Sequence, residues 1–432
     1  MSDPAIGVAG FAALLALIAL GVPVAVAMGT VGVAGFAVLG GLDGAAFVLG
    51  SAPFQAVYPY SLAVVPLFIL MGAFASRAGL SRALYDGVDA LVGHWRGGLA
   101  MATVGACAGF GAICGSSLAT VATMARVALP EMRRHGYDDR LAAGAVAAGG
   151  TLGVLIPPSI LLVVYALLTE QSIARLLVAA LIPGLLATAL YMAAVAVQVR
   201  LWPGLAPAGA RPARARRLRA ALGMWQVAVL FAAIIGGIYL GVFSVTEAAA
   251  GGAFGAVGFA LAGGITRASV AEGLAEAAST TAMIFLILVG AALFNFFIDA
   301  SAVPIWLAER VAALAWPPTA VVVALMLFYL ALGCFMDSLS MMLLTVPFIF
   351  PVVQAMGIDP IWFGVLLVTA VEVGLITPPI GLNLFVIKSV EPALALDAVM
   401  RGSVPFVTAD LVRIALLVAL PALSLWLPGR MA

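Results

Sequence analysis

Long runs of apolar residues alternate with short clusters of glycine, proline and charged residues along most of the chain. The runs at residues 5–41, 173–199 and 404–427 reach or exceed the roughly 20 residues that a helix needs to cross the hydrocarbon layer of a membrane. None shows the alternation of apolar and polar residues that marks a membrane-spanning strand. Because only helices and closed barrels satisfy their backbone hydrogen bonds in lipid, the pattern predicts membrane-spanning helices.

The clusters of glycine, proline and charged residues between these runs predict about ten spans and two further elements of a different kind. The spans are expected at residues 5–20, 23–41, 60–78, 138–169, 173–199, 221–243, 246–263, 279–300, 361–390 and 403–427. Two more apolar stretches, 97–134 and 317–355, turn back at polar centres, and we interpret each as a re-entrant hairpin. The expected fold is therefore an all-α polytopic membrane protein with about 10 transmembrane helices and two re-entrant hairpins.

Composition agrees with this fold class and excludes several others. Apolar residues make up 65% of the 432 residues and charged residues 9%, whereas soluble domains carry about 25% charged residues. The amino-terminal stretch lacks the basic region of a signal peptide, so we interpret it as a first span. Cys107, Cys114 and Cys334 lie in apolar segments without the spacing of a metal site or a disulfide framework. The net charge of +1 gives no indication of nucleic-acid binding.

Lysine and arginine positions predict the orientation, because these residues accumulate in cytoplasmic loops. With the amino terminus outside, Arg175, Arg310 and Arg430 fall outside and Arg413 falls inside a span. The other sixteen fall on the cytoplasmic side: Arg77, Arg82, Arg96, Arg126, Arg133, Arg134, Arg140, Arg200, Arg211, Arg214, Arg216, Arg217, Arg219, Arg267, Lys388 and Arg401. Residues 200–219 contain six arginines and no acidic residue, which we interpret as a cytoplasmic connector between two halves.

Matching residues recur at a constant offset of 221 positions, which indicates two repeats. The pairs are Trp95 and Trp316, Ser117 and Ser338, Gly136 and Gly357, Asp138 and Asp359, Gly153 and Gly374, and Pro157–Pro158 and Pro378–Pro379. An odd number of predicted crossings separates the copies, so the second copy is expected to be inverted, as in many secondary transporters.

The repeat defines the expected domains. The first repeat covers residues 1–200, with an arm helix at 82–95, the hairpin 97–134 and a broken span at 138–169. An Arg-rich connector follows at 201–220. The second repeat covers residues 221–432, with an arm helix at 303–316, the hairpin 317–355 and a broken span at 361–390.

Each half places a hydroxyl-rich hairpin tip opposite a span that a Pro-Pro pair breaks. Non-helical backbone at membrane depth is tolerated where it is buried in protein or lines a wet cavity, and its free carbonyls suit an oxygen-ligated cation. We expect Na⁺ rather than H⁺, because His94 and His135 lie in interfacial segments and a proton relay needs buried acids or histidines. The candidate Na⁺ ligands are Gly115, Ser116, Ser117, Gly150, Gly153, Asp337, Ser338, Gly374 and Thr377.

The amino termini of the half-helices at the same breaks attract negative charge, which predicts a solute that bears a carboxylate. The candidate substrate contacts are Ser117, Thr120, Ser159, Ser340 and Asn383. The serines are equally suited to cap helix ends, and Asn383 could equally tie the broken helix together.

The surroundings of four charged residues in the sequence indicate what each of them does. Asp337 and Glu372 are expected to be buried, where function is the default explanation for a charged group. Glu247 follows Thr246 at an expected external turn, and gating or partner contact is as consistent with it as a solvated loop. Glu372 is a second candidate for gating or partner contact. Arg126 is expected to extend its side chain toward the cytoplasm rather than to hold substrate.

Taken together, these features resemble the large membrane subunit of the tripartite ATP-independent periplasmic (TRAP) transporters, the DctM/SiaM-like proteins, along essentially the whole chain. The resemblance rests on the order and spacing of short motifs. They are Gly21-Val22-Pro23, Pro66 to Gly72, Gly115-Ser116-Ser117 with Ala119, Pro130-Glu131-Met132 with Gly136-Tyr137-Asp138, Ile156-Pro157-Pro158-Ser159, Thr246-Glu247-Ala248-Ala249, and Pro378-Pro379 with Gly381-Leu382-Asn383. The chain departs from the family pattern at Pro360 and at Arg126.

The resemblance implies an elevator-type, Na⁺-driven importer of an organic acid in a bacterial inner membrane, with both termini periplasmic. It also implies two partners, a small four-span membrane subunit and a periplasmic solute-binding protein. Ion sites are implied at Gly115, Ser116, Ser117 and Gly153 in one half and at Asp337, Ser338, Gly374 and Thr377 in the other, positions that the hairpin tips had already indicated.

Two other functions remain as alternatives. A single-subunit divalent-anion/Na⁺ carrier shares the hairpin plan. An intramembrane enzyme is a more distant alternative, because the glycines at 109–115 lack the strand and helix context of a phosphate-binding loop. A Ser/His hydrolase is disfavoured, since neither histidine is expected at membrane depth and no HExxH motif is present. We therefore do not expect an enzyme.

Overall fold

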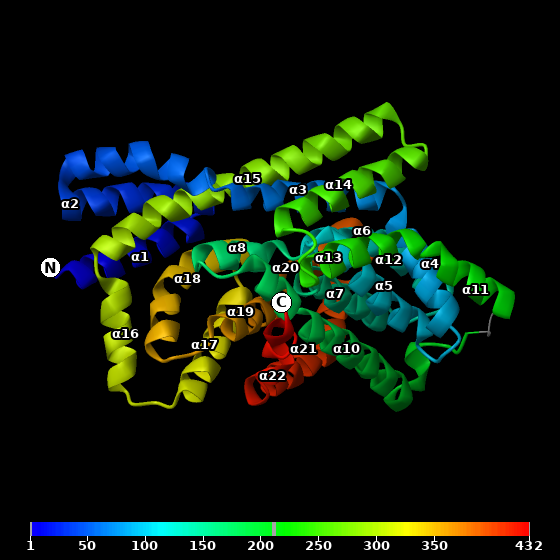
Figure 1. Ribbon diagram of the computed structural model, residues 1–432. Coiled ribbons are helices and arrows are strands. Elements are labelled where there is room, and N and C mark those ends of the chain that lie inside the picture. Colours follow the sequence, from blue (N-terminus) through cyan, green and yellow to red (C-terminus); the bar gives the residue numbers. More distant parts are fainter. Residues whose placement is uncertain (1, 210–212, 432) are drawn as a thin grey trace.

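The chain folds into helices joined by short loops, in a computed structural model that describes residues 2–209 and 213–431 (Figure 1). An isolated antiparallel bridge between Arg96 and Ala208 is the only strand-like pairing within these ranges. Arg211, expected in the cytoplasmic connector, lies outside the described residues.

The first half of the described chain contains ten α-helices and two short 3₁₀ turns. In chain order these are α1 (Asp3–Ala19), α2 (Val24–Val57), η1 (Tyr60–Ala63), α3 (Val64–Arg77), α4 (Leu80–Val92), α5 (Gly98–Cys114), α6 (Ser117–Arg134), α7 (Asp139–Leu155), α8 (Ile160–Leu168), α9 (Ile173–Ala179), α10 (Leu181–Leu201) and η2 (Pro203–Leu205).

The second half continues with twelve α-helices, a π-helical turn (η3) and a 3₁₀ turn (η4). They are α11 (Arg214–Gly223), α12 (Trp225–Phe231), η3 (Ala232–Gly236), α13 (Gly237–Tyr239), α14 (Val245–Ala262), α15 (Arg267–Ala300), α16 (Val303–Ala313), α17 (Pro318–Gly333), α18 (Ser338–Ala355), α19 (Pro360–Gly374), α20 (Leu382–Val390), α21 (Leu396–Ala419), α22 (Ala422–Leu425) and η4 (Pro428–Arg430).

Length and apolar composition identify membrane spans among these helices. Within the described residues, seven helical segments are long and apolar enough to cross a membrane, or up to nine if each bent pair counts as one span. Four shorter apolar helices accompany them, namely α1, α5, α17 and α19. The protein is therefore an all-helical, multi-pass membrane protein.

Several helix boundaries differ from the expected spans. The span expected at 23–41 continues to Val57, because Gly41 adopts a positive φ of 78° and the chain resumes a helix beyond this kink. The span expected at 279–300 begins at Arg267, where alanine and glutamate extend the helix through residues that their polarity had assigned to a loop. The span expected at 403–427 ends at Ala419, before Pro421.

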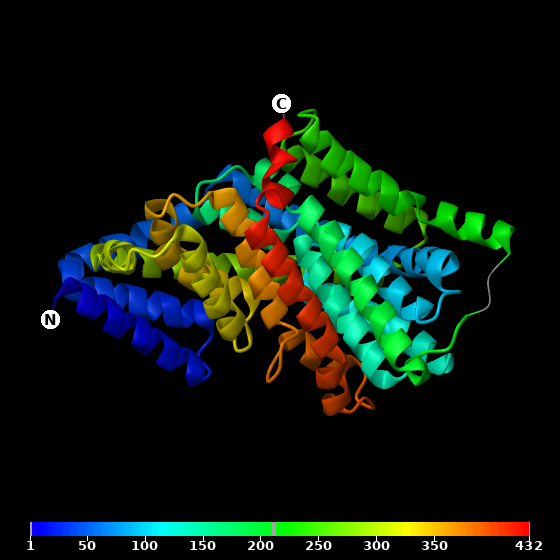
Figure 2. The ribbon, with the colours of Figure 1, turned by 90° about the horizontal axis from the view of Figure 1, so that it is seen from below.

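The most deeply buried helices are α7 and α19, at the centre of the molecule (Figure 1). Every residue from Leu141 to Leu155 in α7 and from Ile361 to Gly374 in α19 is buried. A helix that is apolar on all sides is stable only when other helices surround it. Here α5, α6 and α21 pack around α7, and α17 packs along α19. Figure 2 shows α21 crossing the molecule beside α10.

α7 and α19, at the centre of the molecule, occupy corresponding places in the two halves of the chain. In each half a pair of helices, α5 and α6 or α17 and α18, is followed by a long helix that ends before a Pro-Pro sequence and a short helix that resumes after it. The loops of the two pairs and the two Pro-Pro breaks are therefore the places where irregular backbone occurs near buried helices.

Candidate functional site

Both Pro-Pro sequences interrupt a helix beside the buried core. α7 ends at Leu155 and α8 begins at Ile160, with a bend of 42° between them. α19 ends at Gly374 and α20 begins at Leu382. The Pro157–Pro158 and Pro378–Pro379 peptide bonds are cis. Because proline has no backbone N–H, each break leaves carbonyl groups of the preceding turn without intrahelical donors.

The loop between α5 and α6 lies directly against the first break. Gly115 ends α5 with a φ of 65°, a left-handed conformation that other residues rarely adopt. Ser116 caps α6 by accepting a hydrogen bond from the Ala119 N–H at 3.4 Å. The hydroxyl of Thr120 donates to the Ser116 carbonyl at 2.7 Å. These hydrogen bonds order the loop at the start of α6, and a β-carbon at Gly115 would crowd the Pro158 carbonyl of the break.

Glycines allow α7 to approach this loop closely. A β-carbon at Gly153 would overlap the Thr120 side chain and the Ser116 carbonyl, and one at Gly150 would overlap Val121. Gly111 of α5 packs on the backbone of Gly153. The structure therefore brings together most of the oxygen donors expected in the first half.

The second half has a related but looser arrangement. Asp337 caps α18 and accepts a hydrogen bond from the Ser340 N–H at 2.9 Å. Thr377 donates its hydroxyl to the Val373 carbonyl at 2.6 Å. Gly374 packs against the backbone of Gly333. Asp337 is half-buried, so the expectation that it is fully buried is wrong, because its loop reaches the protein surface.

A direct contact joins the two halves. The amide Nδ2 of Asn383, at the start of α20, lies 2.9 Å from the Ser117 hydroxyl oxygen, and the hydroxyl lies 3.1 Å from Asn383 Oδ1. Asn383 also approaches the Ala147 carbonyl of α7 at 3.4 Å. Ser117 is 3% exposed and Asn383 is fully buried. The Asn383 side chain therefore bonds to the opposite half and not to the other piece of its own broken helix.

The remaining candidate hydroxyls lie at helix ends. Ser159 caps α8 and accepts from the Leu162 N–H at 3.2 Å. Ser340 is buried in the first turn of α18, and Ser338 begins that helix. Capping accounts for the position of Ser159, which is fully buried.

Glu247 and Arg126 lie away from the two loops. Glu247 is in the first turn of α14, where its carboxylate accepts from the N–H and the hydroxyl of Ser244 at 2.8 Å each. It is an exposed capping residue, so the expected turn is a helix start. Arg126 is exposed and donates to the Ala122 carbonyl of its own helix at 3.1 Å.

A buried ion pair between Arg413 and Asp410 was not expected from the sequence. Arg413 Nη2 lies 2.9 Å from Asp410 Oδ1, and both side chains are 1% exposed. The Tyr191 hydroxyl donates to Asp410 Oδ2 at 2.6 Å and lies 3.0 Å from the Thr151 hydroxyl. Glu372, fully buried in α19, is near this pair. In the sequence, this pair could have been found from an aspartate and an arginine three residues apart, Asp410 and Arg413, inside an apolar span.

Two acids lie in the centre of the molecule. Glu372 was expected to be buried, whereas Asp410 was not singled out, and both are fully buried.

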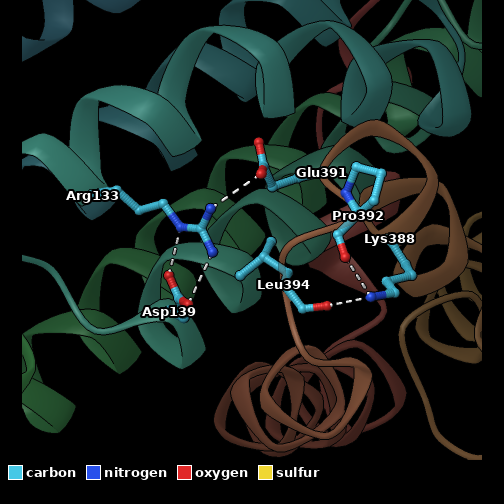
Figure 3. A network of polar contacts seen from close by, with 6 residues as sticks. All are labelled: Arg133, Asp139, Lys388, Glu391, Pro392 and Leu394. Carbon is cyan, nitrogen blue, oxygen red and sulfur yellow. Dashed lines mark hydrogen bonds and ion pairs between the residues drawn. The ribbon is translucent and has the colours of Figure 1, made fainter.

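Ion pairs connect the end of α6 to the start of α7 and to the segment after α20 (Figure 3). Arg133, near the end of α6, contacts both carboxylate oxygens of Asp139 at 2.8 and 3.0 Å and Glu391 at 3.1 Å. Lys388 donates to the carbonyls of Pro392 and Leu394 at 2.7 Å each. Arg133 thus links α6, the start of α7 and the segment after α20.

The donor set decides which cation could bind. Within the described residues, no group of three or more His, Cys, Asp or Glu side chains could hold a metal ion. Hydroxyls, backbone carbonyls and the Asp337 carboxylate are the oxygen donors at the loops and breaks, and oxygen donors of this kind suit a hard cation.

Known proteins resemble this chain in sequence and in fold. Residues 11–423 match the family described as the tripartite ATP-independent periplasmic transporter, DctM component. The C4-dicarboxylate TRAP transporter large permease protein DctM of Pseudomonas aeruginosa is 37% identical over 403 residues, which cover 90% of this chain and 93% of that protein.

A fused relative and a solved structure extend the comparison. The isethionate TRAP transporter permease protein DctMQ of Oleidesulfovibrio alaskensis is 31% identical over 436 residues, covering 99% of this chain and 67% of that protein. The crystal structure of the YdaH transporter of Alcanivorax borkumensis shares the fold with a TM-score of 0.62 at 18% identity, covering 88% of this chain and 89% of that one.

Proposed function

The chain belongs to the DctM component family of tripartite ATP-independent periplasmic transporters, and from this premise we propose that it forms the transport path of a Na⁺-coupled importer of an organic acid. The observation that carries this proposal is the buried contact between Ser117 and Asn383. It joins the loop of one helix pair to the broken helix of the opposite half, at a place where hydroxyls, an amide and free carbonyls converge.

The proposed solute is a small organic anion. The relatives named above are a C4-dicarboxylate and an isethionate permease, and both names describe anions. In this chain the amino termini of α6 and α8 bring backbone N–H groups to the first loop and break, where they favour negative charge. We assign the substrate contacts to Ser117, Thr120, Ser159, Ser340 and Asn383.

Sodium is the proposed coupling ion. The first site would use Gly115, Ser116, Ser117, Gly150 and Gly153, whose backbones crowd together where α6 meets α7. Oxygen ligands of this kind suit a weakly held hard cation, by analogy with calcium sites.

The second sodium site would use the corresponding positions of the other half, Asp337, Ser338, Gly374 and Thr377. The Asp337 carboxylate keeps acceptor capacity beyond its single bond to the Ser340 N–H. The Gly374 backbone packs on Gly333 beside this loop.

Alternating access would follow from two inverted repeats that move as an elevator. The matching order of elements in the halves supports this proposal, with an arm helix (α4 or α16), a helix pair and a broken helix in each. The pairs and broken helices would form the moving domain, and the arms with α2, α3, α14 and α15 would stay fixed in the lipid of a bacterial inner membrane with periplasmic termini.

Two partners are proposed, a periplasmic solute-binding protein and a small four-span membrane subunit. This chain covers 67% of the length of the DctMQ relative. The rest of that relative is long enough to hold a fused second subunit. Exposed apolar side chains along the fixed helices, such as Phe47, Phe54 and Leu286, suit contact with lipid or with a membrane partner.

Uptake into proteoliposomes tests the proposal. Radiolabelled dicarboxylates and other organic acids are offered with and without an inward Na⁺ gradient, the small subunit and the receptor. Uptake that needs Na⁺ and the receptor is the expected result. Na⁺-driven uptake by this chain alone would instead identify a single-subunit carrier, and uptake that is independent of Na⁺ would refute the coupling ion.

A further inference from the structure

A hollow of about 500 Å³ lies where α5 packs along α10, beside the loop that joins α4 to α5. Its volume falls within the roughly 300–1,000 Å³ of pockets that bind small molecules. Met192, Ala193, Ala196 and Val199 of α10 line it, together with Met101 of α5. The α10 positions lie on one face of the helix. The hollow is therefore an apolar groove that follows α10 for roughly 10 Å, at 1.5 Å per residue.

Two arginines lie at one end of this groove. Arg200 follows Val199 near the end of α10, and Arg96 lies in the loop before α5. Both side chains are exposed, and both line the hollow. The ion pairs of the described residues use other arginines, namely Arg77, Arg82, Arg133, Arg134, Arg401 and Arg413. Two guanidinium groups are thus available to an anion at this end of the groove.

The segments around the groove supply no opposing charge. Residues 93–114 and 181–209 form the groove and the loop that pairs with Arg96, and they contain no aspartate or glutamate. Asp86 and Asp89 of α4 precede this region, and neither lines the hollow. Six arginines and no acid occur from residue 200 to residue 219. This end of the molecule therefore favours negatively charged ligands.

Trp95 completes a set of side chains that suits a phospholipid. It is 52% exposed and lines the hollow next to Arg96. Tryptophan is enriched at the depth of the lipid headgroups, and arginine forms paired hydrogen bonds with phosphate oxygens. An apolar groove that ends at a tryptophan and two arginines matches an acyl chain that ends at a phosphate.

Charge distinguishes this groove from a surface that packs against another protein helix. A second hollow, of about 670 Å³, lies along α2, and among the described residues its lining contains no charged side chain. Charged residues are depleted at the centres of protein interfaces. Two arginines without a carboxylate partner therefore favour a lipid headgroup over a protein helix in the groove beside α10.

We propose that the groove between α5 and α10 binds one anionic phospholipid, from the membrane leaflet on the side of the arginine-rich connector. The lipid phosphate accepts hydrogen bonds from Arg96 and Arg200, and one acyl chain lies along α10 from Val199 to Met192. The lipid thereby holds the loop before α5 against the end of α10. The site is separate from the loops and breaks assigned to solute and sodium, so it stands independently of the transport proposal.

The dependence of stability on lipid tests the headgroup contacts. The purified full chain in a neutral detergent is titrated with phosphatidylglycerol or with phosphatidylcholine of the same acyl chains, and the unfolding temperature is measured. A saturable rise with phosphatidylglycerol at the lower concentration is expected. The double variant Arg96→Gln/Arg200→Gln should need about 25-fold more phosphatidylglycerol, or about fivefold for each arginine.

The matched control is Arg82→Gln/Arg140→Gln, which removes two other exposed arginines that do not line the hollow. This variant should keep the wild-type dependence on phosphatidylglycerol. An equal loss in both double variants would overturn the proposal, as would equal effects of the two lipids on the wild-type chain. A rise of the same size with glycerol phosphate alone would indicate an anion site without an acyl chain and would also overturn it.

Filling the groove tests the acyl-chain contact without changing the charge. Ala193→Trp places a large side chain in the hollow, and it should abolish the preference for phosphatidylglycerol. Val197→Trp is the control, because Val197 is 54% exposed on the same helix and does not line the hollow. Unfolding temperatures without lipid show whether each variant folds, and the arginine variants decide the question if Ala193→Trp does not.

A membrane partner is the competing occupant of the groove. The small membrane subunit is co-expressed, and its recovery with the tagged full chain is measured. Ala193→Trp should leave this recovery unchanged. Loss of the small subunit in Ala193→Trp, with an unchanged response to phosphatidylglycerol, would assign the groove to the partner and overturn the lipid site.

Discussion

Ser117 and Asn383 are 266 positions apart, yet their side chains meet at 2.9 and 3.1 Å in a buried site. The contact joins α6 of the first half to α20 of the second. In a protein whose proposed mechanism moves these elements together, this pair links the loop directly to the helix that follows the opposite break.

Replacement of Asn383 by alanine should weaken both stability and uptake. It leaves the Ser117 hydroxyl buried without its partner, a loss of about 1–3 kcal/mol, and we expect uptake to fall by roughly tenfold or more. Ser389→Ala is the control, because its exposed hydroxyl bonds only to the Val386 carbonyl of the same helix. Thermal unfolding and uptake measure the effect. Wild-type values for Asn383→Ala would show that the link is unimportant.

Alanine at Gly153 or Gly374 should separate helices that now touch. A β-carbon at Gly153 would meet Thr120 and Ser116, and one at Gly374 would meet the Gly333 backbone. Overpacking of this kind costs about 1–3 kcal/mol. Gly258→Ala in α14 is the control, since a β-carbon at Gly258 would have no atom of another group within 4 Å. Unfolding temperatures that do not differ between these variants and the control would contradict the close approach.

Replacing one member of the buried ion pair should lower the stability strongly, whereas replacing both members should lower it only slightly. Arg413→Met leaves Asp410 buried without its cation, which costs about 3–5 kcal/mol in comparable pairs. The double variant Arg413→Met/Asp410→Leu should recover most of this loss, because neither charge remains. Denaturation of purified protein in detergent measures both. A double variant less stable than Arg413→Met would refute the charge argument. Arg401→Gln, in an exposed pair with Asp397, is the matched control.

Arg133→Gln should loosen the brace shown in Figure 3. Its two bonds to Asp139 and one to Glu391 connect three segments. Because the group is partly exposed, we expect a loss of only about 1 kcal/mol that shrinks as salt is raised. Arg134→Gln serves as the control, since its side chain is 78% exposed and 3.9 Å from Glu131. Equal unfolding temperatures for the two variants at low salt would argue against the brace.

Sodium should stabilise the protein if it binds as proposed. A ligand that binds only the folded state adds about 2.7 kcal/mol at a hundred times its dissociation constant. The unfolding temperature should therefore rise with NaCl and not with choline chloride at equal ionic strength. Asp337→Asn should reduce this rise, and Asp397→Asn, an exposed residue paired with Arg401, should not. An equal rise with both salts would count against a sodium site.

Local chemistry made a large part of this fold predictable. Proline lacks the backbone N–H that a helix requires, so the helix ends before Pro157 and Pro378 could be located from the sequence. Apolar length indicated the membrane class. The limits of α2 and α15 were missed, since a kink at Gly41 and a polar helix start at Arg267 do not interrupt a helix as a loop would.

The sequence by itself determined the family, the membrane class and the positions of the irregular backbone, because these depend on residues that are neighbours in the chain. Only the tertiary structure decided that Asn383 reaches Ser117 and that Tyr191 of α10 donates to Asp410 of α21. Such pairings depend on how α6, α10, α20 and α21 pack. In a core of similar apolar helices, many packings satisfy the same pattern, and the detailed fit of side chains selects one.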